Sequence, residues 1–185
     1  MSGAAGSSQW MYASGFEIEQ SLRFDNTRVT YLHRNTVATS DGRKKFTISC
    51  WFKLGSNGGI IGSGSCAFFR SADAQITYES GGKISVFGGV ATSRTSAQFR
   101  DPAAWMHLVV AVDTTQGTAA NRLKVWLNGD EITTWTNQAI PAQDFQCSLE
   151  ANINMHWGAY NATYYKMCGY IAECHYLDGV AKVQT

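Results

Sequence analysis

The sequence predicts an all-β protein in which two antiparallel sheets pack face to face as a jelly-roll sandwich. Apolar residues recur with the period of two that is typical of strands, and amphipathic helical periods are scarce. The 185 residues include 18 glycines and only two prolines, and serines and threonines are frequent between the apolar runs. Many short strands without helices to cover a parallel sheet leave an antiparallel sandwich as the fold class.

The first strands are predicted from alternation. Residues 45 to 54 set Phe46, Ile48, Cys50 and Phe52 on one face of a strand, as the core side of a sandwich requires. Further short strands are expected over residues 17 to 24, 58 to 64, 66 to 71, 74 to 80 and 83 to 89.

The second half of the chain continues the pattern. Residues 122 to 135 are the clearest hairpin, because Asn128 and Gly129 suit the positive φ angles of a tight turn. Residues 148 to 160 supply a late strand, and only residues 101 to 106 suggest a helical turn. A long strand is expected over residues 106 to 113, with its core face formed by Met106, Leu108, Val110 and Val112.

The last predicted strand is GYIAECHYLDG, residues 169 to 179, which has a glycine at each border and lies close to the end of the chain. The first and last strands of a sandwich commonly lie side by side. We therefore expect this strand to fill a central slot next to the strand over residues 17 to 24, so that the end of the chain is needed for folding.

Composition and charge restrict the class of protein. Hydrophobic residues make up 44% of the chain and charged residues 16%, which is enough for one sizeable core. The formal net charge of +1 gives no reason to expect nucleic acid or an anionic membrane as a partner. No leader pattern or membrane span is recognisable, so we expect a soluble protein made in a cytoplasm, with an arm over residues 1 to 16 and one domain over residues 17 to 185.

The cysteines and acidic residues do not predict a metal or a disulfide framework. Five cysteines at irregular spacings are expected to be mostly small buried side chains. Cys168, Cys174 and His175 come nearest to a zinc site, but the chain contains no CxxC pair. We expect no cofactor. A calcium site is not supported either, because its candidates are candidates by residue type alone: Asp25, Asn26, Asp73, Asp113 and Asp178.

Four segments carry a resemblance to a known family. They are SLRFDNTRVTYLHR, FTISCWFKLG, DPAAWMHLVVAVDTTQGTAANRLKVWLNGDEIT and GYIAECHYLDG. In this order they resemble the motifs of the laminin-G-like, concanavalin A-like jelly-roll domains of bacteriophage virion proteins, over residues 17 to 179. The five cysteines and the short segment after the closing motif depart from the family pattern.

The concanavalin A-like fold also houses glycoside hydrolases, which use paired carboxylates. Glu17 and Glu19 fall on one face of a predicted strand, a separation compatible with such a pair. The hydrolases of this fold carry a third carboxylate in alternation, where this chain has Ser21. No catalytic residue is therefore assigned, and a degenerate glycoside hydrolase stays an alternative.

Carbohydrate binding is the stronger functional prediction, because sugars stack their apolar faces on aromatic rings. Trp51, Trp105 and Trp126 fall at recurring family positions and are interpreted as packing residues. Aromatic residues in or beside loops are the better candidates for a glycan or a protein partner. These candidates are Trp135, His156, Trp157, Tyr160, Asn161, Tyr164 and Tyr165.

The arm over residues 1 to 16 interrupts a Gly-, Ala- and Ser-rich composition with Trp10, Met11 and Tyr12. These three side chains are candidate anchors on a neighbouring subunit, capsid or tail, or else they fold back over the domain itself.

The resemblance implies a non-enzymatic virion protein, a capsid decoration or knob-type protein on the virion surface, assembled in the host cytoplasm. Other virion proteins, further copies of the chain and cell-surface glycans are the expected partners, and a receptor-binding lectin module of a tail fibre is the alternative.

Overall fold

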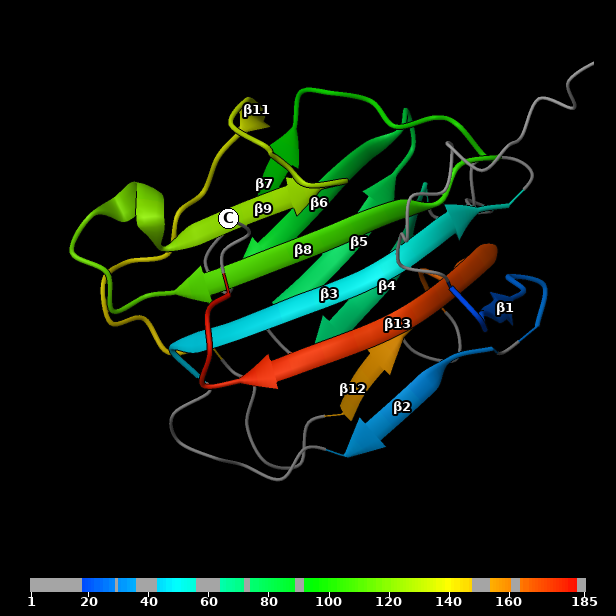
Figure 1. The fold of residues 1–185 in the computed structure, drawn as a ribbon, viewed down its shortest axis with the longest axis horizontal. Helices are drawn as coiled ribbons and strands as arrows, with labels where there is room; N and C mark the ends of the chain where they lie inside the picture. Colours follow the sequence, from blue (N-terminus) through cyan, green and yellow to red (C-terminus); the bar gives the residue numbers. More distant parts are fainter. Residues whose placement is uncertain are drawn as a thin grey trace, which may run out of the picture.

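The computed structural model describes residues 18–28, 30–35, 43–55, 64–71, 74–88, 92–147, 154–160 and 164–182. Within these residues the chain forms two antiparallel sheets that stack as two layers (Figure 1). The strands are β1 (Leu22–Phe24), β2 (Leu32–Asn35), β3 (Lys45–Leu54), β4 (Ser65–Ser71), β5 (Ala74–Glu79), β6 (Lys83–Gly88), β7 (Thr92–Thr95), β8 (Met106–Asp113), β9 (Leu123–Leu127), β10 (Asp130–Glu131), β11 (Trp135–Asn137), β12 (Asn154–Trp157) and β13 (Gly169–Asp178).

The strand order defines the two sheets. The six-stranded sheet has the order β1-β13-β3-β8-β9-β10, and the seven-stranded sheet has the order β11-β7-β6-β5-β4-β12-β2. Neighbouring strands run in opposite directions throughout both sheets. The predicted two-sheet jelly-roll sandwich is therefore confirmed.

The core lies between the sheets and follows from alternation in the long strands. β3 buries Phe46, Ile48, Cys50 and Phe52, the face that its sequence predicts. Phe52 meets Phe68 from the other sheet with the ring centroids 4.3 Å apart. Burying these side chains against each other removes apolar surface from water, the main favourable contribution to folding. β8 adds the other predicted core residues, which are all buried: Met106, Leu108, Val110 and Val112.

β13, the last strand of the described residues, is an inner strand of the six-stranded sheet. It pairs with β1 on one side, where Leu22 lies opposite Ile171, and with β3 on the other, from Gly169 opposite Leu54 to Asp178 opposite Phe46. In Figure 1 the late strand β13 lies beside the earlier β3 and β1. The expected central slot next to the first strand is confirmed, although β1 is only three residues long.

The predicted hairpin is also present. Asn128 and Gly129 join β9 to β10 with φ angles of 53° and 92°, the positive values that a tight primed turn requires. The Asn128 side chain accepts a hydrogen bond from the backbone N–H of His107 at 2.8 Å, which ties the turn to the start of β8. Local turn chemistry and sheet pairing thus specify the same register.

Several predicted boundaries differ from the structure. Residues 101 to 106 form bends that lead into β8 instead of a helical turn, because Met106 already belongs to the strand. The helical element of the described residues is the 3-10 turn η3 (Ala119–Asn121). The strand predicted over residues 17 to 24 begins only at Leu22 among the described residues, as β1, and the described part of the one predicted over residues 148 to 160 contains β12. Residues 17, 58–63 and 148–153 lie outside the described part.

Short strands at the sheet edges escaped sequence prediction. β2 and β11 are edge strands of the seven-stranded sheet, and β7 pairs with β11 near one of those edges. Their sequences, LHRN, WTN and TSRT, are too short and too polar to alternate visibly. Short polar edges are a usual way to discourage pairing between sheets of different molecules.

The five cysteines occupy buried or partly buried positions, as small apolar side chains do. Cys50, Cys66 and Cys147 are buried, Cys168 and Cys174 are partly buried, and none of the five forms a disulfide. The interpretation of the cysteines as packing residues therefore fits the structure. No helix in the described ranges is long and apolar enough to cross a membrane.

Candidate functional site

A row of polar and aromatic side chains crosses the outer face of the seven-stranded sheet. The register places His33 of β2 opposite His156 of β12, His156 opposite Arg70 of β4, and Arg70 opposite Gln75 of β5. Directly paired residues share a face of a sheet, so these side chains point the same way, away from the core. The neighbours Phe69 and Ile76 are buried on the inner side.

The loop after β12 covers part of this row and forms a hollow with it. The hollow has a volume of about 620 Å³ and is lined by Arg70, Gln75, Tyr160, Tyr164 and Tyr165. Two strands of the sheet thus supply the polar floor and the loop supplies three tyrosines. We call this set of residues the tyrosine hollow.

Arg70 is the centre of the tyrosine hollow. Its guanidinium carbon lies 3.3 Å from the centroid of the Tyr160 ring, in the geometry of a cation–π contact. An Arg70 guanidinium N–H also donates a hydrogen bond to the side-chain oxygen of Gln75. Tyr160 in turn lies 5.6 Å from Tyr165, centroid to centroid. Each of these side chains is therefore held by a neighbour.

Three further rings extend the row beyond Arg70. Tyr31 lies 5.2 Å from His156 and 5.9 Å from His33, and the two imidazoles are 6.3 Å apart, all between centroids. Burial, followed by the charges of His33 and Arg70, lowers the pKa of His156 below its ordinary 6.5. At neutral pH His156 is therefore an uncharged imidazole with one donor and one acceptor nitrogen.

Backbone contacts fix the loop that carries the tyrosines. Gly158 follows β12 with a φ of +84°, and a Cβ built on it would lie 2.2 Å from the Phe24 ring. Tyr160 donates its N–H to the carbonyl of Tyr164 at 3.1 Å, and the carbonyl of Tyr165 accepts the N–H of Ala67 at 2.8 Å. Because these bonds tie the backbone of Tyr160 to that of Tyr164 and the backbone of Tyr165 to β4, the three tyrosines are positioned before any ligand arrives.

The structure brings together four of the predicted site residues: His156, Tyr160, Tyr164 and Tyr165. Trp157 points the opposite way from His156 and packs on Phe69 with the centroids 5.0 Å apart. Trp135 lies on the edge strand β11 at the far side of the sheet, partly buried against the core. The remaining candidates lie outside the described residues: Asn161 of the loop, and Trp10, Met11 and Tyr12 of the arm.

Half of the residues in this row were not predicted from the sequence. Arg70, Gln75, Tyr31 and His33 come from strands or turns far from the aromatic cluster in the chain. Arg70 reads in the sequence as a charged residue at the end of a strand, and nothing local distinguishes it from the other arginines. Only the pairing of β4 with β12 places it under the loop.

Of the two carboxylates considered as a catalytic pair, only Glu19 lies within the described residues. Glu17 lies outside the described residues, and Glu19 is exposed ahead of β1. On the seven-stranded sheet Glu79 accepts a hydrogen bond from the Ser85 hydroxyl and pairs with Arg94 at 2.6 Å. The Glu79 carboxylate is thus engaged by its neighbours.

Two of the calcium candidates, Asp25 and Asp113, likewise serve local structure, and Asp73 lies outside the described residues. Asp25 accepts hydrogen bonds from the backbone and side chain of Thr27. Asp113 accepts bonds from Thr115 and Gln116 and lies 3.6 Å from Lys45. Among the residues described, no three His, Cys, Asp or Glu side chains are grouped so that they could hold a metal ion.

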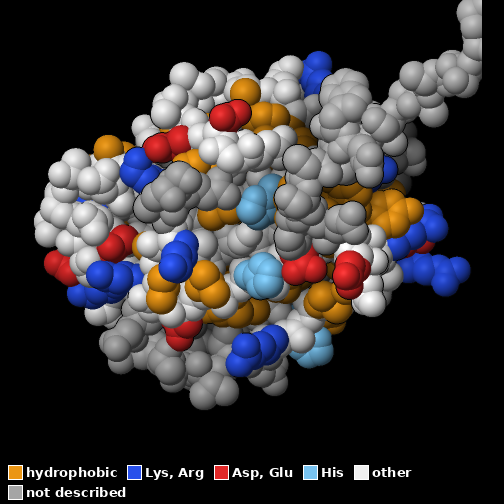
Figure 2. All heavy atoms as spheres, viewed as in Figure 1, with side chains coloured by type: hydrophobic (Ala, Val, Ile, Leu, Met, Phe, Trp, Pro, Cys, Tyr) orange, Lys and Arg blue, Asp and Glu red, His pale blue; other side chains and the backbone are white. Residues whose placement is uncertain are grey.

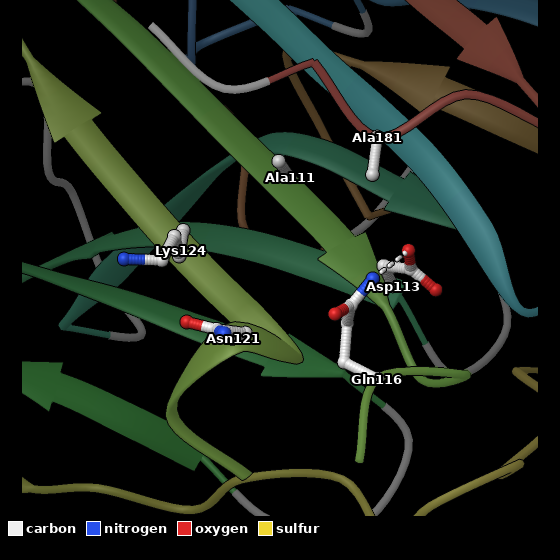
Figure 3. Close-up of a pocket in the computed structure, with 6 residues that line it drawn as sticks. All are labelled: Ala111, Asp113, Gln116, Asn121, Lys124 and Ala181. Atoms are coloured by element: carbon white, nitrogen blue, oxygen red, sulfur yellow. Dashed lines mark hydrogen bonds between the residues drawn. The ribbon is translucent and has the colours of Figure 1, made fainter. Parts of the chain in front are cut away.

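Asp113 also borders a small hollow at one end of the six-stranded sheet, about 260 Å³ in volume, in which Gln116 points back at Asp113 (Figure 3). Burial alone would raise the pKa of Asp113, but hydrogen bonds from Thr115 and Gln116 and the charge of Lys45 outweigh it, so the pKa lies below 3.8. These contacts join β8 to the following turn, and we interpret this hollow as part of the scaffold.

Comparison with known proteins gives one family and several similar folds. The family described as the concanavalin A-like lectin/glucanases superfamily matches residues 25–175. No curated protein matches the chain. Because the similar solved structures are under 25% identical to it, they inform on the fold alone.

Three solved structures illustrate the likeness. A putative carbohydrate binding protein from Bacteroides ovatus is 11% identical with a TM-score of 0.62, over 91% of this chain and 46% of that one. Domains LG4-5 of the mouse laminin alpha1 chain are 12% identical with a TM-score of 0.55, over 90% and 44%. Domain 4 of the Geobacillus stearothermophilus arabinanase AbnA, in complex with arabinotriose, is 17% identical with a TM-score of 0.50, over 90% and 94%. The chain spans less than half the length of the first two proteins.

Proposed function

The chain belongs to the concanavalin A-like lectin/glucanase superfamily, and from this premise we propose that it is a carbohydrate-binding domain whose ligand occupies the tyrosine hollow. The observation that carries the proposal is the arrangement of Arg70 and Gln75 beneath Tyr160, Tyr164 and Tyr165. Aromatic rings pack on the apolar faces of sugars, and guanidinium and amide groups hydrogen-bond to their hydroxyls.

The size of the tyrosine hollow fits this role. Small-molecule sites in proteins commonly enclose roughly 300 to 1,000 Å³, and the volume of about 620 Å³ lies in the middle of this range. The Tyr164 side chain is exposed at the rim, where it is accessible to a ligand. The relatives named above include a putative carbohydrate binding protein and a domain in complex with arabinotriose, which adds a second line of support.

The lining favours binding over hydrolysis. Hydrolysis of a glycosidic bond by the usual route needs two carboxyl groups on either side of the bond. The described lining of the tyrosine hollow consists of one arginine, one glutamine and three tyrosines. These groups recognise hydroxyls and ring faces, and none of them is an acid at neutral pH.

A glycan array followed by calorimetry tests the proposal. The unaltered chain is expected to bind a subset of glycans, and Tyr160→Ala is expected to weaken that binding about tenfold or more, while Tyr160→Phe keeps most of it. Circular dichroism on all three proteins controls for folding. Selective binding that Tyr160→Ala leaves unchanged would place the ligand elsewhere, and the absence of binding to every glycan would refute the function.

We further propose that the domain is displayed on the surface of a bacteriophage particle, as a capsid decoration or knob-type protein. This rests on the four ordered segments that resemble virion proteins, above all the closing GYIAECHYLDG strand. Mass spectrometry of purified particles tests it: hundreds of copies per particle indicate the shell and a handful indicate the tail. Particles without the protein would contradict the location and leave the proposal of glycan binding untouched.

A further inference from the structure

The outer face of the six-stranded sheet, opposite the tyrosine hollow, carries a second hollow. It has a volume of about 340 Å³ and is lined by Ser49, Trp51, His107, Glu173 and His175. Figure 2 looks onto this sheet and shows histidine and acidic side chains next to each other near the middle of the face. We call this set of residues the serine hollow.

The sheet register brings these side chains together. Ser49 and Trp51 are two apart on β3, so both point outward. Ser49 lies opposite His175 of β13, and Trp51 lies opposite His107 of β8. Three central strands of one sheet therefore build the site, which makes it rigid compared with a site built on loops.

A hydrogen bond and a ring stack orient the Ser49 hydroxyl and the His107 imidazole. The Ser49 hydroxyl oxygen lies 2.9 Å from Nε2 of His107. The His107 ring stacks on Trp51 with the centroids 4.8 Å apart and 19° between the planes. Burial, followed by the charge of His175, lowers the pKa of His107, so its imidazole is neutral at neutral pH and offers one donor and one acceptor.

The β13 side presents a carboxylate through a local irregularity. The register between β13 and β3 shifts between Ala172 and His175, which marks a β-bulge, and Glu173 within it has a φ of +49°. A positive φ is uncommon for a residue other than glycine, and bulges re-aim side chains next to binding sites. The Glu173 carboxylate lies 3.4 Å from Nε2 of His175, and its side chain remains 41% exposed.

We propose that the serine hollow is a second saccharide-binding site, which accepts a neutral sugar unit through neighbouring hydroxyl groups. An exposed carboxylate accepts hydrogen bonds from two vicinal hydroxyls, and the hydroxyl and imidazole groups of Ser49 and His107 provide further partners. Trp51 supplies the aromatic surface. An acidic sugar is excluded by repulsion from Glu173, which separates its ligand class from that of a site centred on an arginine.

Two sites on opposite faces would make the domain bivalent. The serine and tyrosine hollows share no residue and lie on different sheets. A bivalent domain can bridge two glycan chains, or can hold one surface through two weak contacts with a gain in avidity. The serine hollow goes beyond the function proposed above, and either site can fail without the other.

Nuclear magnetic resonance titration of the full chain tests the second site. The probes are the methyl glycosides of glucose, galactose and mannose, together with N-acetylglucosamine and glucuronic acid, each at tens of millimolar. We expect a neutral sugar to shift the Trp51 indole N–H and the amides around His107 and His175. Glucuronic acid should leave these signals in place.

Variants assign those shifts to the site. Glu173→Gln, which keeps the shape of the side chain, is expected to raise the dissociation constant for the sugar at least fivefold. Glu131→Gln on β10 of the same sheet is the matched control and should have no effect, as should Tyr160→Ala. The second site is overturned if no neutral sugar shifts these signals, or if Glu173→Gln leaves the titration unchanged. Retained glycan binding at the tyrosine hollow would then show that only the second site is wrong.

Discussion

The guanidinium carbon of Arg70 lies 3.3 Å above the ring of Tyr160, although the two residues are far apart in the sequence. Arg70 comes from β4 and Tyr160 from the loop after β12, and the antiparallel pairing of these two strands brings them together. The contact orients the planar cation along the floor of the tyrosine hollow. The specificity of the hollow therefore depends on the shape of this side chain as well as on its charge.

Replacing Arg70 with lysine should weaken glycan binding about tenfold, which corresponds to roughly 1.4 kcal/mol. Lysine keeps the charge but loses the planar group that stacks on Tyr160 and donates to Gln75. Isothermal titration calorimetry with a glycan identified on the array measures the change. Arg94→Lys on β7 of the same sheet is the matched control, because Arg94 pairs with Glu79 away from the tyrosine hollow. Equal affinities for Arg70→Lys and the unaltered chain would contradict the role of the stack.

Gly158→Ala should destabilise the fold by roughly 3 kcal/mol or more, because two costs combine. The residue has a φ of +84°, and the added methyl group would lie 2.2 Å from the Phe24 ring. Gly129→Ala is the matched control: its φ of +92° is also positive, but nothing lies within 4 Å of the added methyl group, so the cost should be about 1 kcal/mol. Urea unfolding of both variants decides the point, and equal losses would show that contact with Phe24 is unimportant.

The sequence determined the scaffold more clearly than the site, and particular residues show why. β3 alternates apolar and more polar positions, so its inward face could be assigned residue by residue. β8 has an apolar residue at every second position, on its core face, but it also buries Val109 and Ala111 on the other face. The same rule separates His156 from Trp157: neighbours on a strand face opposite sides, so only one of them could join an outer site. The role of Arg70 could not be predicted from the sequence, because it depends on which strand pairs with β4. That pairing is a property of the whole topology.

The free energy of unfolding should fall as the pH drops below about 6.5. Burial and neighbouring charges lower the pKa of both His107 and His156 in the folded state. An unfolded histidine keeps the ordinary pKa, so below 6.5 the unfolded chain binds more protons and gains stability relative to the fold. The full stability is present above this pH and is lost as the pH falls through the two lowered pKa values.

Urea unfolding at a series of pH values between about 7.5 and about 5 measures this slope. The groups that face His156 are Tyr31, His33 and Arg70, and those near His107 are Ser49, Trp51 and His175. The double variant His107→Gln, His156→Gln should flatten the slope, with each single variant removing part of it. A slope that the double variant leaves intact would assign the effect to other residues.

Buried thiols should resist modification until the protein unfolds. Burial raises the pKa of Cys66 to about 12 and that of Cys50 well above its usual value, and Cys147 is also buried. The thiolate is the reactive form, so these three cysteines should be labelled at the rate of unfolding, after the partly buried Cys168. Mass spectrometry after timed treatment with iodoacetamide locates each label. Rapid labelling of Cys66 in the native protein would contradict its position in the core.

The last strand should be required for folding, whereas the segment that follows it should contribute only part of the stability. β13 pairs with β1 and β3 together, and it buries Ile171 in the core. A chain that ends at Cys168 leaves β3 and β1 with unpaired edges and an open core, so it should be unfolded or aggregated. After β13, the Thr47 hydroxyl donates to the carbonyl of Val180 at 2.7 Å and accepts the N–H of Lys182 at 2.8 Å.

A chain that ends at Asp178 loses the two Thr47 bonds and the bond from the N–H of Gly179 to the carbonyl of Lys45 at 2.9 Å, but it keeps the whole sheet. Because a hydrogen bond contributes about 1 kcal/mol net, this chain should fold with a free energy of unfolding lowered by roughly 3 kcal/mol. Thr47→Val in the full chain removes the two Thr47 bonds without shortening the backbone, and should reproduce most of this loss. Circular dichroism and urea unfolding compare the three proteins. A folded chain ending at Cys168 would show that the sandwich closes without β13, which its place between β1 and β3 argues against.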